Sequence, residues 1–156
     1  MGNIVYLAER SGARHGVERG QGPAQSAQRI LLAYSGTSGR EYLAVFLASR
    51  GYHVTTCGNG KEALRHLASG QFALVVTGIE MPHMDGLELV RALRRVGPLV
   101  IAVTDGTGRM DNIYLRSAIL SGAVAAHTFR EAGTALLRSV DWILRGRDDV
   151  IKDVVW

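Results

Sequence analysis

The residues best suited to chemistry in this sequence are polar side chains that directly follow short apolar runs. Ser35, Thr77 and Thr104 supply hydroxyls at such positions, and Glu80 and Asp105 supply carboxylates. A carboxylate can accept a phosphoryl group or bind a hard metal ion, but a lone exposed loop carboxylate is normally just solvated. A hydroxyl nucleophile needs an adjacent general base, and none is evident beside Ser35 or Thr77. These residues alone therefore predict no catalytic centre.

Metal-binding side chains are scattered along the chain. The histidines are His15, His53, His66, His83 and His127. They show no i, i+4 or HxH spacing, so we predict no metal site and no cofactor. A single cysteine, Cys57, excludes an internal disulfide and a Cys-based zinc cluster, and we expect it to be a small buried hydrophobe. His127 either faces the candidate site described below or is an ordinary histidine, packed in the fold or lying at the surface.

A hydroxyl- and glycine-rich stretch, Ser35–Arg40, offers a second kind of site. Its candidate ligands are Ser35, Thr37, Ser38 and Arg40. Backbone N–H groups at a helix start, with hydroxyls and an arginine, can bind an anion. The stretch is similar to the phosphate loop of flavodoxins, although no aromatic pair is evident to sandwich a flavin. The alternative is an ordinary glycine turn in which Ser38 caps the helix.

Short apolar runs alternate with segments of helical spacing from Arg29 onward. The runs are 30–33, 53–57, 72–76, 99–103 and 123–126, and the helical segments are 41–50, 61–69, 87–96, 111–121 and 132–145. Continuous apolar strands separated by amphipathic helices predict a parallel sheet covered on both faces. The fold class is thus a doubly wound α/β sandwich, whose ligands bind at the carboxyl ends of the strands.

Four helix starts match the capping-box pattern, in which a polar side chain precedes a Glu by three residues. The pairs are Ser38–Glu41, Asn59–Glu62, Asp85–Glu88 and Thr128–Glu131. The pattern explains Asp85 better as a helix cap than as a phosphoacceptor or metal ligand.

The segment Met81–Leu87 reads Met-Pro-His-Met-Asp-Gly-Leu. It resembles the loop after the third strand of response-regulator receiver (CheY-like) domains, and the resemblance extends over about residues 29–146. The resemblance implies a five-stranded parallel sheet in the order 2-1-3-4-5, the flavodoxin-like three-layer sandwich.

The chemistry of that family is altered at nearly every position. Receivers place a phosphoacceptor Asp at the end of strand three, an acid pair for Mg²⁺ after strand one, a Thr or Ser after strand four and a Lys after strand five. The corresponding residues here, which we call the vestigial pocket, are Tyr34, Ser35, Gly78, Thr104 and Phe129. Only Thr104 matches, and the switch aromatic of strand five is replaced by Ala126. The resemblance therefore implies an atypical receiver without Asp phosphorylation.

Length and composition set the expected organisation. The 156 residues predict a flexible leader (1–28), one receiver-like domain (29–146) and a short apolar tail (147–156), with no effector domain. A content of 47% apolar and 21% charged residues excludes wholesale disorder. With no signal peptide or membrane span evident, we expect a cytoplasmic protein. The net charge of +4 comes without a basic cluster, so we expect no nucleic-acid partner.

The expected function is signal transduction by a stand-alone, non-enzymatic receiver in a two-component or phosphorelay system. Its partner would be a signalling protein, such as a histidine kinase or an output protein. Receivers commonly bind partners through the face formed by the fourth helix, fifth strand and fifth helix. The tail could dock there or support a homodimer. The alternative function is a sensor of a phosphate- or nucleotide-bearing small ligand that uses the Ser35–Arg40 stretch.

Overall fold

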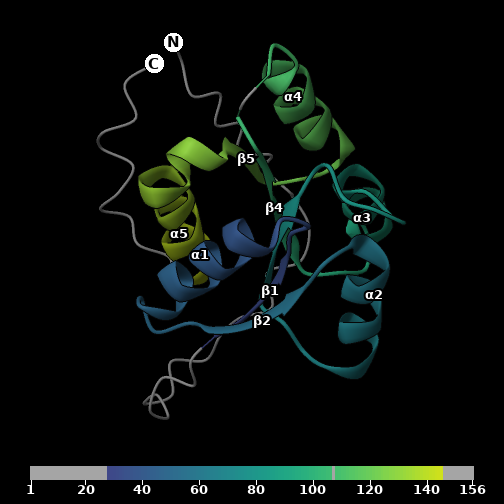
Figure 1. Ribbon diagram of the computed structural model, residues 1–156. Coiled ribbons are helices and arrows are strands. Elements are labelled where there is room, and N and C mark those ends of the chain that lie inside the picture. The colour runs from purple at the N-terminus through teal and green to yellow at the C-terminus, as the bar shows by residue number, and fades with distance from the viewer. Residues whose placement is uncertain (1–27, 107, 146–156) are drawn as a thin grey trace.

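Five parallel strands form the central layer, in the order β2-β1-β3-β4-β5 (Figure 1). They are β1 (Arg29–Ala33), β2 (His53–Cys57), β3 (Leu74–Gly78), β4 (Leu99–Thr104) and β5 (Ala125–Thr128). The computed structural model describes residues 28–106 and 108–145. The predicted leader, apart from its last residue, and the predicted tail lie outside these ranges. The predicted strand order and fold class are confirmed.

Helices cover both faces of the sheet. Figure 1 shows α1 (Thr37–Ala48) and α5 (Leu137–Arg145) on one side. The other side carries α2 (Gly60–Ser69), α3 (Gly86–Leu93) and α4 (Asp111–Ser121). Successive side chains along a strand point to opposite faces of the sheet and belong to two separate apolar cores. Leu32 packs toward α1 and α5, whereas Leu31 packs toward the other helices. Because both faces are covered, the strands read as unbroken apolar runs.

The start of α1 differs from the prediction. The helix begins at Thr37 rather than Glu41, and the Arg40 N–H donates to the Gly36 carbonyl at 2.8 Å. Gly36 therefore occupies the N-cap position, where it has no side chain to contribute. The prediction that Ser38 caps this helix was wrong, because Ser38 already lies inside the first turn.

Two strands lie further along the chain than predicted. β3 spans 74–78 rather than 72–76, and β5 spans 125–128 rather than 123–126. Both strands include polar or small residues at their carboxyl ends, because these residues pair with the neighbouring strand. Gly78 pairs with Val103 of β4, and Thr128 pairs with Thr104 of β4. The predicted helix 132–145 is also divided. A 3₁₀ turn, η1 (Phe129–Glu131), and a π-helical turn, η2 (Ala132–Leu136), precede α5.

The loop between β3 and α3 is fixed by its backbone. The Gly86 N–H donates to the Ile79 carbonyl at 2.8 Å, and a Cβ on Gly86 would lie 1.9 Å from the Gly78 oxygen. Asp85 then starts α3 with a complete capping box, as predicted. Its carboxylate accepts from the Glu88 N–H at 2.8 Å, and its own N–H donates to Glu88 Oε2 at 2.9 Å.

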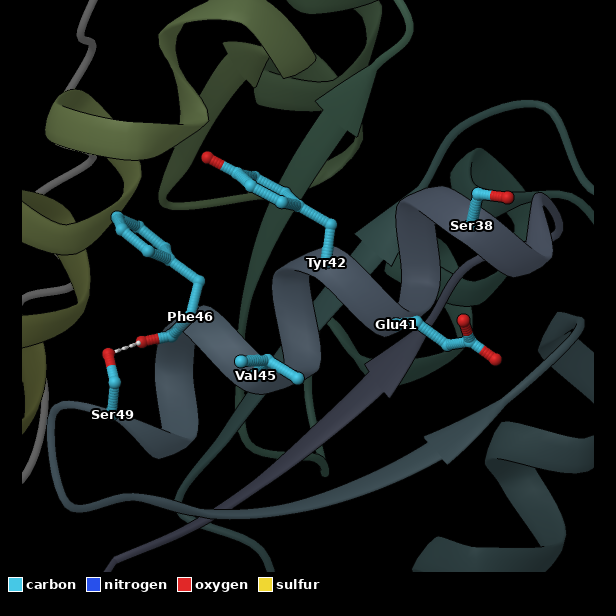
Figure 2. A pocket seen from close by; sticks show the side chains of 6 residues that line it. All are labelled: Ser38, Glu41, Tyr42, Val45, Phe46 and Ser49. Atoms are coloured by element: carbon cyan, nitrogen blue, oxygen red, sulfur yellow. Dashed lines mark hydrogen bonds between the residues drawn. The ribbon is translucent and has the colours of Figure 1, made fainter.

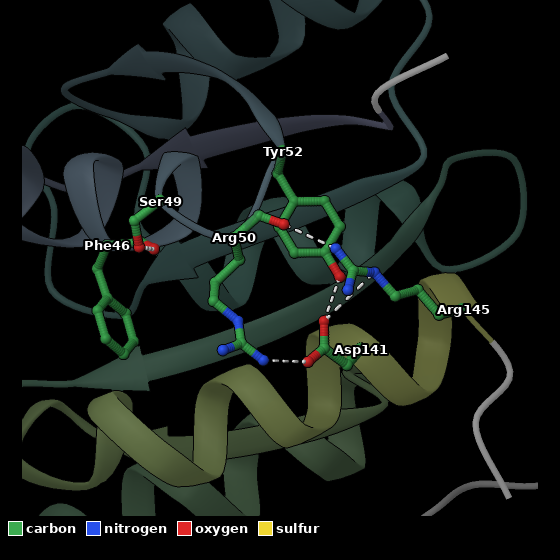
Figure 3. Close-up of polar contacts among 6 residues, drawn as sticks. All are labelled: Phe46, Ser49, Arg50, Tyr52, Asp141 and Arg145. Carbon is green, nitrogen blue, oxygen red and sulfur yellow. Dashed lines mark hydrogen bonds and ion pairs between the residues drawn. The ribbon is translucent and has the colours of Figure 1, made fainter. Parts of the chain in front are cut away.

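A buried carboxylate joins α5 to the turn between α1 and β2. Asp141 is 7% exposed and accepts a hydrogen bond from the Tyr52 hydroxyl (Figure 3). Its oxygens also lie 3.3 Å from Arg50 Nη2 and 3.6 Å from Arg145 Nε. Arg145 Nη2 further donates to the Arg50 carbonyl at 2.7 Å. These contacts hold the C-terminal end of α5 against the C-terminal end of α1.

Candidate functional site

The carboxyl ends of β1, β3, β4 and β5 bring the vestigial pocket residues together. The register aligns Ala33 with Thr77 and Gly78 with Val103, so residues that follow these strands share one edge of the sheet. Tyr34 follows β1, and Phe129 follows β5. This edge is where open α/β sheets bind ligands.

The ring of Tyr34 fills the space beside Gly78. Tyr34 is 6% exposed, and a Cβ built on Gly78 would lie 3.0 Å from Tyr34 Cδ2. On its other side, a Cβ on Gly39 would lie 2.8 Å from Tyr34 Cε1. The ring therefore sits between two glycines. A Cβ at residue 39 would force the ring to shift, and one at residue 78 would require it to move by a few tenths of an ångström.

Phe129 packs against the same ring. The Tyr34 and Phe129 ring centroids are 5.8 Å apart, and those of Phe129 and Tyr42 are 5.7 Å apart. Tyr42 in turn stacks on Phe46 at 5.9 Å with an interplanar angle of 9°. These separations are typical of favourable aromatic pairs. We call these four side chains the aromatic series, because they extend from the strand edge to the outer face of α1.

The Tyr34 hydroxyl donates a hydrogen bond to Asp105. Burial raises the pKa of the Tyr34 phenol, and the hydrogen bond to Asp105 and the charge of that carboxylate raise it further. The phenol thus keeps its proton under physiological conditions and remains a donor. Asp105 is exposed, but one of its oxygens is engaged by this contact.

Thr104 is buried and turned toward the start of α4. Its hydroxyl donates to Asp111 Oδ1 at 3.2 Å, while Asp111 Oδ2 accepts from the Gly108 N–H at 3.1 Å. Asp111 thereby holds the Thr104 hydroxyl and the loop before α4 together.

The side chains at this edge do not fit a Mg²⁺ ion, which prefers carboxylate oxygens and water. Tyr34 presents a phenol, and the Ser35 hydroxyl donates to the Glu80 carbonyl at 3.0 Å. The Glu80 carboxylate accepts from the Tyr114 hydroxyl at 3.2 Å. Within residues 28–106 and 108–145, no three His, Cys, Asp or Glu side chains are grouped so that they could hold a metal ion.

The Ser35–Arg40 stretch splits between a short loop and the first turn of α1. Thr37 and Ser38 are exposed in that turn, which carries no acidic side chain. Arg40 Nη1 donates to the Tyr34 carbonyl at 2.7 Å and approaches the Ser35 carbonyl at 3.4 Å. The arginine is therefore engaged by backbone oxygens of the same stretch.

His127 and Cys57 are both buried. His127 is 2% exposed, and its Nε2 lies 2.9 Å from the Ser139 hydroxyl of α5. Of its two predicted settings, the structure has the packed one. Burial lowers the pKa of His127, partly offset by the charge of Glu131. Burial also raises the pKa of the Cys57 thiol to about 11, as expected of a buried hydrophobe.

Sequence reasoning missed the partners that close this site. The Tyr34–Asp105 and Thr104–Asp111 hydrogen bonds and the role of Gly39 were not predicted. One usable signal was present: two positions that are polar or charged in the resembled family are both aromatic here, at Tyr34 and Phe129. Two such changes at neighbouring strand ends indicate rings in mutual contact.

Comparison with known proteins gives a consistent result. The sequence pattern of the response regulator receiver domain family matches residues 31–126. The chain is 42% identical over 71 residues to the response regulator receiver protein CpdR of Brucella abortus, covering 46% of this chain and 59% of CpdR. It is 36% identical over 73 residues to the DNA-binding transcriptional regulator NtrC of Azospirillum brasilense, covering 47% of this chain and 15% of NtrC. The chain thus spans less than two thirds of each of these relatives.

Solved structures agree on the fold. The receiver domain of a histidine kinase from Syntrophus aciditrophicus superposes with a TM-score of 0.68 at 26% identity, covering 78% of this chain and 93% of that domain. The receiver domain of Ssk1 from Saccharomyces cerevisiae, crystallised with the histidine phosphotransfer protein Ypd1, gives a TM-score of 0.63 at 20% identity. That match covers 74% of this chain and 87% of the yeast chain and shows the fold alone.

Proposed function

Since this chain belongs to the response regulator receiver domain family, we propose that it signals through protein–protein contacts without phosphorylation of an aspartate. It is a receiver in two-component signalling whose phosphorylation site is replaced by packed side chains. In this proposal it carries out no catalytic step of its own.

One observation carries the proposal: the Tyr34 ring packs so closely beside Gly78 that even a Cβ at residue 78 would make a tight contact with it. Gly78 offers no carboxylate to accept a phosphoryl group. A Cβ built on it would lie only 3.0 Å from Cδ2 of the Tyr34 ring. Phe129 packs on the same ring. Its apolar side chain supplies no cation to offset phosphoryl charge.

The outer face of α4 supports the partner side of the proposal. Ile113 and Leu120 are 53% and 77% exposed, and their spacing places them on one side of the helix, while Met110, which directly precedes the helix, is 50% exposed. Exposed large apolar groups in a row are typical of protein–protein contact sites. We assign partner binding to the face of α4, β5 and α5, and a homodimer through this face stays a prediction.

The phosphorylation part is tested by intact mass after incubation with acetyl phosphate and Mg²⁺. We expect no added phosphoryl group, while a phosphorylatable receiver treated in parallel gains one. A stoichiometric, acid-labile adduct would contradict the proposal, and its position would identify the acceptor.

The partner face is tested by substituting Leu120→Arg and comparing binding partners by quantitative affinity capture. We expect partners captured by the original chain to be lost. The matched control is Val96→Arg, because Val96 is 88% exposed and follows α3. Equal loss with both variants would argue against this face.

The alternative prediction, a phosphate-bearing ligand on Ser35–Arg40, gains little support from Arg40, because its Nη1 is engaged by backbone carbonyls. A thermal-shift screen with phosphate, nucleotides and FMN tests it. We expect no shift; a saturable shift that Arg40→Ala abolishes would favour the sensor function.

A cytoplasmic location is part of the same proposal. Among residues 28–106 and 108–145, no helix has the length and apolar content needed to cross a membrane. Cell fractionation with an antibody to the chain tests the location.

A further inference from the structure

The outer face of α1 carries a shallow apolar groove of about 450 Å³. It is lined by Ser38, Glu41, Tyr42, Val45, Phe46 and Ser49, and we call it the α1 groove (Figure 2). Tyr42 is 52% exposed and Val45 is 70% exposed. Large apolar side chains this exposed on one helix face indicate a surface that something covers.

The described chain ends beside this groove. Arg145, the last described residue, donates from Nη2 to the Arg50 carbonyl at 2.7 Å. Arg50 directly follows Ser49, which lines one end of the groove (Figure 3). The segment after α5 therefore starts at the C-terminal end of α1, on the face of the sheet that α1 and α5 share.

The length of the following segment is sufficient. From Ser49 back to Ser38, the groove follows 11 residues of helix, or roughly 17 Å. Residues 146–156 can extend over at most about 36 Å. The segment can thus cross from the end of α5 to the far end of the groove with several residues to spare.

The composition of the segment complements the groove. Its apolar residues are Val150, Ile151, Val154, Val155 and Trp156. Lys152 lies among them, and of the described residues that line the groove Glu41 alone is acidic. The segment also carries Arg147, Asp148, Asp149 and Asp153, so its two bases and three acids give no charge match to Glu41, and its fit to the groove rests on the apolar side chains.

We infer that residues 146–156 fold back over the α1 groove of the same chain. Their apolar side chains cover Tyr42, Val45 and Phe46. This inference goes beyond the proposed function, because it concerns α1 rather than the α4 face and holds whether or not the chain is phosphorylated. A partner that binds α1 would have to displace this segment.

The test uses the full chain with Trp142→Phe, which leaves Trp156 as its single tryptophan. We expect blue-shifted Trp156 emission that acrylamide quenches weakly. Adding Val45→Asp should shift the emission to the red and increase quenching. Adding Val96→Asp, an equally polar change at an 88% exposed valine outside the groove, should leave both unchanged. Solvent-exposed Trp156 in the parent chain would overturn the inference.

Tryptic cleavage after Lys152, followed by mass spectrometry, gives a second readout. Cleavage of a transiently opened segment reports how often it opens, and we expect Val45→Asp to speed it about tenfold. Val154→Asp with Val155→Asp should have the same effect without altering the described domain. Equal rates in all variants would overturn the inference. Protection that disappears on dilution would overturn it too, since a second copy would then provide the cover.

Discussion

Tyr34 illustrates how a buried ring can keep its hydroxyl hydrogen-bonded. Its ring packs between Gly78 and Gly39 and against Phe129, and its hydroxyl reaches the exposed Asp105. Because the hydroxyl has a partner, the ring can be buried without leaving a donor unsatisfied. Most of the stabilisation should therefore come from the ring, with a smaller part from the hydrogen bond.

Substitutions at Tyr34 should separate these two parts. We expect Tyr34→Ala to lower the free energy of unfolding by about 3–5 kcal/mol, since it empties the space of a buried ring. Tyr34→Phe should cost about 1 kcal/mol, the usual net contribution of one hydrogen bond. Urea unfolding measures both, with half-exposed Tyr42→Phe as the control. A larger loss with Tyr34→Phe than with Tyr34→Ala would contradict this view.

His127 should make stability depend on pH. Its pKa in the folded chain is below the ordinary 6.5, so the unfolded chain binds a proton that the folded chain does not. The free energy of unfolding should thus fall as pH drops below about 6.5, until the folded histidine also titrates. His127→Gln should reduce this slope by up to about 1.4 kcal/mol per pH unit. Urea unfolding of the two chains between pH 7 and 5 measures the slopes, and equal slopes would contradict this role of His127.

At the scale of elements, two polar residues near helix starts differ in what they contact. Asp85 bonds the Glu88 N–H, whereas Ser38 lies within the first turn of α1. The same sequence pattern therefore has a capping role at one helix and none at the other.

Alanine substitutions should reveal this difference. We expect Asp85→Ala to lower the free energy of unfolding by about 1 kcal/mol, as for other N-caps. Ser38→Ala should change it by less than about 0.5 kcal/mol, as expected of an exposed surface site. Thermal and urea unfolding provide the comparison. If both substitutions lowered the free energy of unfolding equally, Ser38 would stabilise the start of α1 as much as Asp85 stabilises the start of α3, against this prediction.

At the scale of the whole molecule, phosphorylation chemistry needs several strand ends at once. Restoring an acceptor alone, by Gly78→Asp, places a carboxylate against the Tyr34 ring without ligands for Mg²⁺. Restoring Asp at residues 34 and 35 and Lys at 129 as well removes both rings and supplies the missing charges.

We therefore expect only the fourfold variant to gain a phosphoryl group from acetyl phosphate and Mg²⁺. Its members are Tyr34→Asp, Ser35→Asp, Gly78→Asp and Phe129→Lys. Intact mass measures the adduct, and circular dichroism checks that each variant folds. Labelling of Gly78→Asp to the same extent would show that the Tyr34 ring is no obstacle.

The alternation of apolar runs and helical segments was sufficient to predict a parallel sheet and the meeting of strand ends, because these are local, repeated signals. The strand order followed from the resemblance to receiver domains and not from the apolar pattern. The sequence was insufficient for contacts between distant residues. Asp141 is an example: a carboxylate on a helix is expected to face solvent, yet it is buried by Tyr52, 89 residues earlier. The π-helical turn in 132–136 also has no apolar pattern that distinguishes it from an α-helix.

The packing of Gly86 has a consequence for how the loop between β3 and α3 can vary in evolution. The loop by which the family is recognised is held by a glycine whose Cβ would lie 1.9 Å from the Gly78 oxygen, and by the Asp85 cap. None of these contacts requires a side chain at residue 78. The loop can therefore keep its backbone contacts and its helix cap whatever the side chain at residue 78, so its sequence reports the fold independently of the residue at that position.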